Sequence, residues 1–157
     1  MQKITPFLWY DTQAEEAANF YVSIFKNSRI LNVSRYGDAG PGAKDSVMSV
    51  TFELDGQRFI ALNGGPHFKF TPAISFFVDC KDQREVDELW NKLSVNGRTD
   101  HCGWLQDKFG LSWQIVPSIL GQMLADEDQE KSKNVMLAML KMDKLDVQGL
   151  QQAYERH

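Results

Sequence analysis

The sequence predicts the same order of secondary structure twice, and this repeat limits the fold more than any other feature. In the first half, apolar residues that alternate with polar ones predict strands at residues 3–10, 29–36, 47–54 and 57–63. Thr12 and Glu15 form a T-x-x-E capping box that opens a predicted helix ending near Phe25. The first half therefore consists of a strand, a helix and three further strands.

The pattern then restarts, about 70 residues further along the chain. A strand is predicted at 73–78, and a helix begins after Asp82, with an acidic residue at Glu85 in its first turn. Strands at 99–106 and 111–116 complete the second copy. Two such copies predict an α+β fold made of two βαβββ modules.

We expect residues 1–157 to form a single domain with three parts. The first module spans 3–66, the second spans 72–117, and a helical tail spans 118–157. Each module buries its helix against one sheet face and leaves the other face open. Paired side by side, the two sheets are expected to form a cup, and concave apolar surfaces with a few polar groups are typical ligand sites.

Composition excludes several classes of partner. The net charge of −4, without a cluster of Lys and Arg, argues against nucleic acid. No apolar run approaches the roughly 20 residues that cross a bilayer, so no membrane partner is expected. The N-terminus has no hydrophobic signal segment, which favours a cytoplasmic protein. Cys80 and Cys102 are expected to be free thiols, because structural disulfides are rare in that compartment.

Several segments resemble one known family. They are ITPFLWY at 4–10, AEEA with Phe20-Tyr21 at 14–21, ALNGGP at 61–66, CGWLQDKFGLSWQIVP at 102–117, and the tail residues 124–126 and 136–142. Over nearly the whole chain these resemble the PhnB-like branch of the vicinal oxygen chelate superfamily, which includes glyoxalases, bleomycin-resistance proteins and dioxygenases. That branch is often labelled 3-demethylubiquinone-9 3-methyltransferase-like. The resemblance implies a glyoxalase-like fold and a homodimer.

The resemblance also implies where a divalent metal would bind, namely to His, Glu or Gln side chains on the first and fourth strands of each module. Aligned by Phe20-Tyr21, this chain has Thr5, Ala73, Ala61 or Asn63, and Gln114 at those places. Catalytic zinc, manganese and iron sites are built from His, Cys and carboxylate ligands. We therefore expect no metal and no other cofactor.

Methyl transfer, which the family label suggests, is less expected than the binding of a small molecule. A methyltransferase that uses S-adenosylmethionine normally has a glycine-rich loop between a strand and a helix. The only double glycine, Gly64-Gly65, is followed by Pro66 and not by a predicted helix.

The remaining hypothesis is a small-molecule site with aromatic and neutral polar walls. Strand alternation places nine residues on the open faces: Thr5, Phe7, Trp9, Ala61, Asn63, Ser75, Phe77, Ser112 and Gln114. Trp104 is expected at the rim of the site. Two alternatives stay open. A one-residue error in register would expose different side chains and allow a metal-dependent glyoxalase- or dioxygenase-type enzyme, and a filled sheet interior would leave an interaction module.

Overall fold

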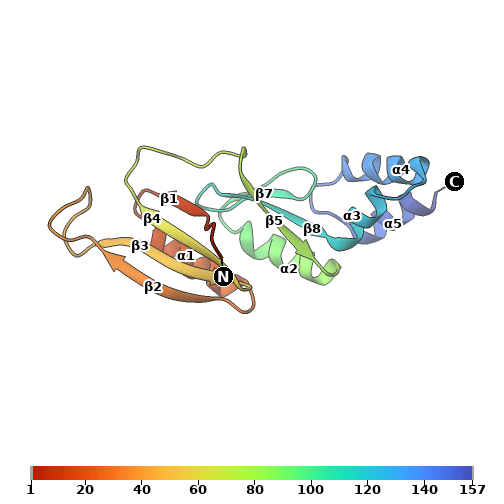
Figure 1. Ribbon diagram of the computed structural model, residues 1–157. Coiled ribbons are helices and arrows are strands. Elements are labelled where there is room, and N and C mark those ends of the chain that lie inside the picture. The colour runs from red at the N-terminus through yellow and green to blue at the C-terminus, as the bar shows by residue number, and fades with distance from the viewer. Residues whose placement is uncertain (1, 157) are drawn as a thin grey trace. The chain divides into compact units, whose positions relative to one another are not determined.

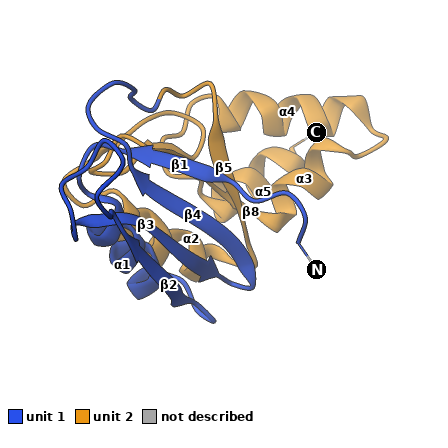
Figure 2. Ribbon diagram, turned by 60° about the vertical axis from the view of Figure 1, so that its left-hand side comes forward, with its two compact units in different colours: residues 1–70 blue, residues 71–157 orange. Residues whose placement is uncertain are grey.

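The computed structural model describes residues 2–156, which fold as two compact units, one ending at Phe70 and the other beginning at Thr71 (Figures 1 and 2). This boundary lies between the two predicted modules. The prediction that the chain forms a single domain stays a prediction.

The first unit is a four-stranded mixed sheet covered by one helix (Figure 2). Its elements are β1 (Phe7–Tyr10), α1 (Ala14–Ile24), β2 (Arg29–Arg35), β3 (Val47–Leu54) and β4 (Gln57–Asn63). The strand order is β1-β4-β3-β2, with β1 parallel to β4 and the other pairs antiparallel. Asp55 and Gly56 form the β3–β4 hairpin turn with φ values of 48° and 82°, as a two-residue type I′ turn requires.

The core of this unit lies between α1 and one face of the sheet. Three alanines on α1, Ala14, Ala17 and Ala18, are buried and let the helix approach the strands closely. The other buried residues are Leu8, Tyr10, Tyr21, Ile24, Val50, Phe52, Leu54, Phe59 and Ala61. The rings of Phe52 and Phe59, which are strand partners, stack with centroids 5.4 Å apart.

The N-terminus of α1 is capped from a distant strand, and the predicted capping box is wrong. The N-cap residue is Gln13, whose side chain makes no capping hydrogen bond. Instead, the Ala14 N–H donates to Asn63 Oδ1 at 2.8 Å, and Asn63 Nδ2 donates to the Val47 carbonyl at 3.1 Å. A side chain from β4 therefore satisfies a helix end that the local sequence leaves open.

The second unit repeats the architecture of the first. Its sheet elements are β5 (Ser75–Cys80), α2 (Gln83–Leu93), β6 (Arg98–Thr99), β7 (Trp104–Gln106) and β8 (Ser112–Pro117). The order β5-β8-β7-β6, with β5 parallel to β8, matches the order of the first sheet. The predicted α+β class and the two βαβββ modules are confirmed. The predicted cap of α2 is also confirmed, since Asp82 Oδ1 accepts from the Glu85 N–H at 2.9 Å.

The predicted strand over 99–106 is divided in two. A turn at residues 100–103 separates β6 from β7, with Cys102 and Gly103 at φ values of 60° and 84°. A Cβ atom at Gly103 would lie 2.8 Å from the Ile115 carbonyl oxygen, so the turn needs glycine for space as well as for its backbone angles.

The predicted helical tail is confirmed and consists of α3 (Ser118–Leu124), α4 (Gln129–Met139) and α5 (Val147–Glu155) (Figure 1). It has a core of its own that continues from the end of β8. The buried members are Val116, Leu120, Met123, Val135, Leu145 and Leu150. Asp128 caps α4 by accepting from the Glu130 and Lys131 N–H groups.

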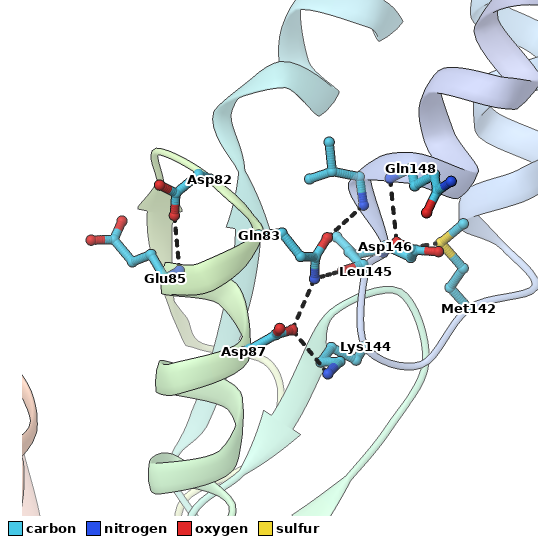
Figure 3. A network of polar contacts seen from close by, with 10 residues as sticks. Asp82, Gln83, Glu85, Asp87, Met142, Lys144, Leu145, Asp146 and Gln148 are labelled. Carbon is cyan, nitrogen blue, oxygen red and sulfur yellow. Dashed lines mark hydrogen bonds and ion pairs between the residues drawn. The ribbon is translucent and has the colours of Figure 1, made fainter.

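A polar network joins the tail to α2 (Figure 3). Gln83 Nε2 donates to the Leu145 carbonyl at 3.0 Å and to Asp87 Oδ1 at 2.9 Å, and Gln83 Oε1 accepts from the Val147 N–H at 2.6 Å. Lys144 Nζ lies 2.9 Å from Asp87 Oδ1. The hydrogen bond from Gln83, followed by the Lys144 charge, lowers the pKa of Asp87 below its ordinary value.

None of the helices within residues 2–156 is long and apolar enough to span a membrane.

We predict that Asn63→Ala destabilises the protein by about 2 kcal/mol, because it removes both the cap of α1 and the bond to Val47. Thr12→Ala is the matched control and should change the free energy of unfolding by less than about 0.5 kcal/mol. Urea denaturation measures both variants. A larger loss for Thr12→Ala than for Asn63→Ala would contradict this assignment of the cap.

Gln83→Ala should destabilise the protein by about 1–2 kcal/mol at pH 7, because two backbone groups of the tail lose their partner. The Asp87 pKa should rise in this variant. A carboxylate whose pKa is lowered by folding stabilises the protein above its unfolded pKa and loses that contribution as the pH falls. The difference in the free energy of unfolding between wild type and Gln83→Ala should therefore become smaller below about pH 4. Equal urea midpoints at pH 7 would contradict the role of Gln83.

Candidate functional site

The second sheet brings five predicted site residues together on the face opposite α2. The buried side chains of Leu105, Trp113 and Ile115 define the α2 face. Strand neighbours alternate, so the residues between them lie on the other, open face. These residues are Ser75, Phe77, Trp104, Ser112 and Gln114.

Two cross-strand rows arrange these residues. In the first row, Gln114 pairs with Phe77 on one side and with Trp104 on the other. Adjacent strands are about 4.8 Å apart, so Phe77 and Trp104 flank Gln114 at roughly 10 Å from each other. Phe77 is 61% exposed. This row is an aromatic pair separated by one amide.

The second row is entirely hydrophilic. Ser112 pairs with Ser75 and with Gln106, and Gln106 in turn pairs with Arg98 at the outer edge. Sequence reasoning missed Gln106, although it lies two residues after Trp104 and strand alternation places both on one face. We refer to Ser75, Ser112 and Gln106 as the polar row.

One hydroxyl in the polar row has no hydrogen-bond partner. Gln114 Nε2 donates to Ser75 Oγ at 3.0 Å, so the Gln114 amide nitrogen and the Ser75 oxygen each have one hydrogen-bond partner. Ser112 is only 1% exposed, and its Oγ is the one buried side-chain polar atom of residues 2–156 without a partner. Buried polar groups are nearly always hydrogen-bonded, so an exception in a folded protein needs an explanation, such as strain, a catalytic role or a bound water or ion.

Charged groups lie only at the ends of this face. Asp79 Oδ1 accepts from the Ser118 hydroxyl at 2.7 Å, at the start of the tail. Arg98 Nη2 lies 3.8 Å from Asp100 Oδ2 at the opposite edge, and both side chains are exposed. The centre of the face is therefore neutral, aromatic and able to form hydrogen bonds.

In the first sheet, only some of the predicted site residues lie on the face opposite α1. Phe7 and Trp9 lie opposite the α1 side, where they pair with Ile60 and Leu62. Thr5 precedes β1 and is half-buried. Thr5 and Phe7 stand 70 residues before Ser75 and Phe77, so they are the repeat counterparts of those two residues.

The predicted placement of Ala61 and Asn63 on the open face is wrong. Ala61 is fully buried and pairs with the core residues Leu8 and Val50. Asn63, two residues further on, caps α1. Both side chains therefore face the helix, and the open face of β4 carries the residues between them.

Trp9 is held in place by the segment that follows β4. Its Nε1 donates to the Gly65 carbonyl at 2.9 Å, and its ring meets Phe68 edge-on with centroids 4.9 Å apart. A Cβ at Gly64 would lie 2.4 Å from the Trp9 ring, so only glycine fits there. These contacts indicate a structural role for Trp9.

His101 and the two cysteines take part in other contacts. His101 Nδ1 is 2.7 Å from Asp143 Oδ1, which links the turn before β7 to the tail. Cys102 Sγ contacts the Met139 carbonyl oxygen at 3.6 Å. Cys80 is buried, and this burial raises its pKa to about 12, which keeps the thiol protonated. Both cysteines are free, as predicted.

Comparison with known proteins supports the resemblance in the sequence. The model of the family described as 3-demethylubiquinone-9 3-methyltransferase matches residues 2–116. The chain belongs to this PhnB-like family. A PhnB protein from Bacillus cereus is 41% identical, with a TM-score of 0.68 over 74% of this chain and 99% of that one. No protein with a curated description matches the chain.

More distant structures share the fold alone. Protein PA1353 from Pseudomonas aeruginosa is 19% identical, with a TM-score of 0.63 over 74% of this chain and 98% of that one. The fosfomycin resistance protein FosX from Listeria monocytogenes, described in complex with Mn(II) and sulfate, is 13% identical. Its TM-score is 0.50 over 71% of this chain and 86% of that chain. The family match ends before α3, so it does not include the tail.

The open faces of this PhnB-like chain do not fit a catalytic metal. The open-face side chains of β1, β4, β5 and β8 are aromatic, aliphatic, hydroxyl and amide groups, apart from Arg58 and Asp79 near the strand ends. Ala61 and Asn63, at the positions implied as ligands, face α1. Within residues 2–156 no three His, Cys, Asp or Glu side chains group together in a way that would hold a metal ion.

The methyltransferase name of the family also lacks a matching site. A Rossmann-type methyl-donor site lies at the end of a parallel, doubly wound sheet. Both sheets here are mixed, with only one parallel pair each, and Gly64-Gly65 leads into a loop.

The assignment of faces predicts losses of stability of very different size for two adjacent phenylalanines. Phe76 packs edge-on against Trp113 with centroids 5.4 Å apart, so Phe76→Ala should cost about 3 kcal/mol of stability. Phe77→Ala should cost less than about 1 kcal/mol, because Phe77 is 61% exposed. Thermal or urea unfolding measures the difference, and the reverse order would show that β5 is one residue out of register.

Proposed function

We propose that this PhnB-like protein binds a small organic molecule on the open face of its second sheet, without a catalytic metal. The observation that carries the proposal is the pair of rows on β5, β8 and β7. They combine two aromatic side chains with hydrogen-bonding groups that are not fully used within the chain. Ligand sites are typically apolar surfaces with a few polar groups that fix orientation.

Five residues on the face of the second sheet opposite α2 support the proposal. Phe77 and Trp104 supply apolar contact area, and Ser75, Ser112 and Gln114 supply the polar contacts. Thr5, Phe7 and Trp9 of the first sheet remain proposed ligand contacts, with Trp9 already engaged by Gly65 and Phe68. Binding alone, for sequestration or transport, needs no nucleophile or paired carboxylates.

The side chains on the open face argue against a metal-dependent enzyme, because they include few of the ligands that catalytic metals use. FosX is described with Mn(II), and manganese sites use carboxylate and imidazole ligands. Gln114 is a neutral amide, and its nitrogen already donates to Ser75. Methyl transfer ranks lower again, because the chain has no glycine-rich loop that leads into a helix.

We also propose that the protein acts as a homodimer. Phe7 and Ile74 are 57% and 70% exposed, and large exposed apolar side chains favour burial at an interface. Light scattering at micromolar concentration tests this proposal, and a monomer mass across that range would contradict it.

The function is tested by titrating a fragment library into protein prepared with EDTA and into protein saturated with Mn(II). We expect fragments to shift the Trp104 indole signal in NMR spectra with equal affinity in both preparations. Trp104→Ala should weaken binding about tenfold, which corresponds to losing the contacts of one aromatic wall. Phe20→Ala, on α1 and away from the proposed contacts, is the aromatic control and should leave this binding unchanged.

Two results would contradict the proposal. Binding that occurs only after Mn(II) is added, with metal bound at stoichiometry, would support a metal-dependent enzyme. Fragment signals confined to other parts of the protein would place the site elsewhere.

A further inference from the structure

A carboxamide of the protein itself, on Gln114 in the neighbouring row, already reaches into the polar row. Gln114 Nε2 reaches Ser75 Oγ at 3.0 Å. Ser75 is the strand partner of Ser112, which lies two residues before Gln114, so the Gln114 side chain runs diagonally along the sheet. Its amide satisfies Ser75 and leaves the neighbouring Ser112 hydroxyl unbonded.

The unbonded hydroxyl has a free-energy cost that a suitable ligand would remove. A buried hydroxyl without a partner loses its water hydrogen bonds and gains none in return. Ser112 can both donate and accept, and its strand partner Gln106 carries an amide that can do the same. A group that presents an N–H and a C=O side by side would pair with this row.

The charges around the row argue against an ionised ligand. Asp79 lies on the same face, two residues beyond Phe77, and would repel an anion. Arg98 lies just beyond the Gln106 end of the row, two strands away from Ser112, and is paired with Asp100. A buried charge without a direct partner is strongly unfavourable, so Ser112 has a suitable environment only for a neutral group.

We propose that the polar row recognises a neutral carboxamide or lactam group, attached to a planar ring that contacts Phe77 and Trp104. This inference rests on the proposed function and names the ligand class for that site. The ligand amide takes the place of the Gln114 amide at Ser75 and completes the hydrogen bonding of Ser112. No covalent step is involved.

The test compares three probes that share one ring and one shape but differ in charge: benzamide, benzoate and benzamidinium. Titrations of the full-length protein are followed by NMR at the Gln106 and Gln114 side-chain amides and at the Trp104 indole. We expect benzamide to bind at least fivefold more tightly than either ion, since each ion must lose its hydration without a counter-charge at Ser112.

Two variants separate this inference from a purely structural role of Ser112. Ser112→Ala should weaken benzamide binding about fivefold, the value of one net hydrogen bond. The same variant should leave the melting temperature of the free protein unchanged or raised, because it removes an unsatisfied hydroxyl. Arg98→Ala is the control, and it should not change benzamide affinity.

Each contrary result has a distinct meaning. Tighter binding of benzoate, lost in Arg98→Ala, would overturn the neutral ligand class while leaving the proposed function intact. A lowered melting temperature of free Ser112→Ala would show that the hydroxyl has a structural partner, such as a buried water, and would overturn the inference. If neither the three probes nor the fragment library moves signals of the second sheet, the proposed function fails as well.

Discussion

The pairing of β8 with β5 and β7 is the constraint on which the candidate site depends. As the strand between two neighbours, β8 gives Trp113 and Ile115 to the core under α2 and presents Ser112 and Gln114 on the opposite face. The core side is fixed by the buried Asp107, whose carboxylate accepts from the Trp113 indole N–H at 2.9 Å and from the Leu111 N–H at 3.1 Å. Because side chains alternate along a strand, fixing Trp113 also fixes the direction of its neighbours.

The tail makes hydrogen bonds to two parts of the same unit, the turn before β7 and the start of α2. The Cys102 and Gly103 N–H groups donate to the carbonyls of Met142 and Asp143, each at 2.8 Å. These bonds hold the turn that leads directly into β7, and β7 carries Trp104. Gln83 ties the start of α5 to α2 on the same unit. The tail lies outside the family match, yet it is built into the unit that carries the candidate site.

The fold was largely predictable from the sequence because its signals are local. The hairpin at Asp55-Gly56 and the cap at Asp82 act within four residues, and the alternating apolar pattern that predicts the strands is also local. The open face of the second sheet was predictable for a similar reason. Phe77 and Gln114 alternate with core residues, and the boundaries of β5 and β8 are clear.

The errors arose where alternation fails or where partners are distant in sequence. The β4 residues from Phe59 to Leu62 are all apolar, so their pattern cannot tell which face is buried, and Ala61 was placed on the wrong side. Asn63 caps α1 across 49 residues of sequence, which no local motif predicts. The unbonded Ser112 hydroxyl is likewise a property of packing.

A crystal structure of the protein soaked with small ring-bearing fragments would test the central claim most directly. The account predicts fragment density over Gln114, between Phe77 and Trp104, with a polar atom within hydrogen-bond distance of Ser112 Oγ. Density for a coordinated metal on this face, or fragments bound only away from the second sheet, would contradict it.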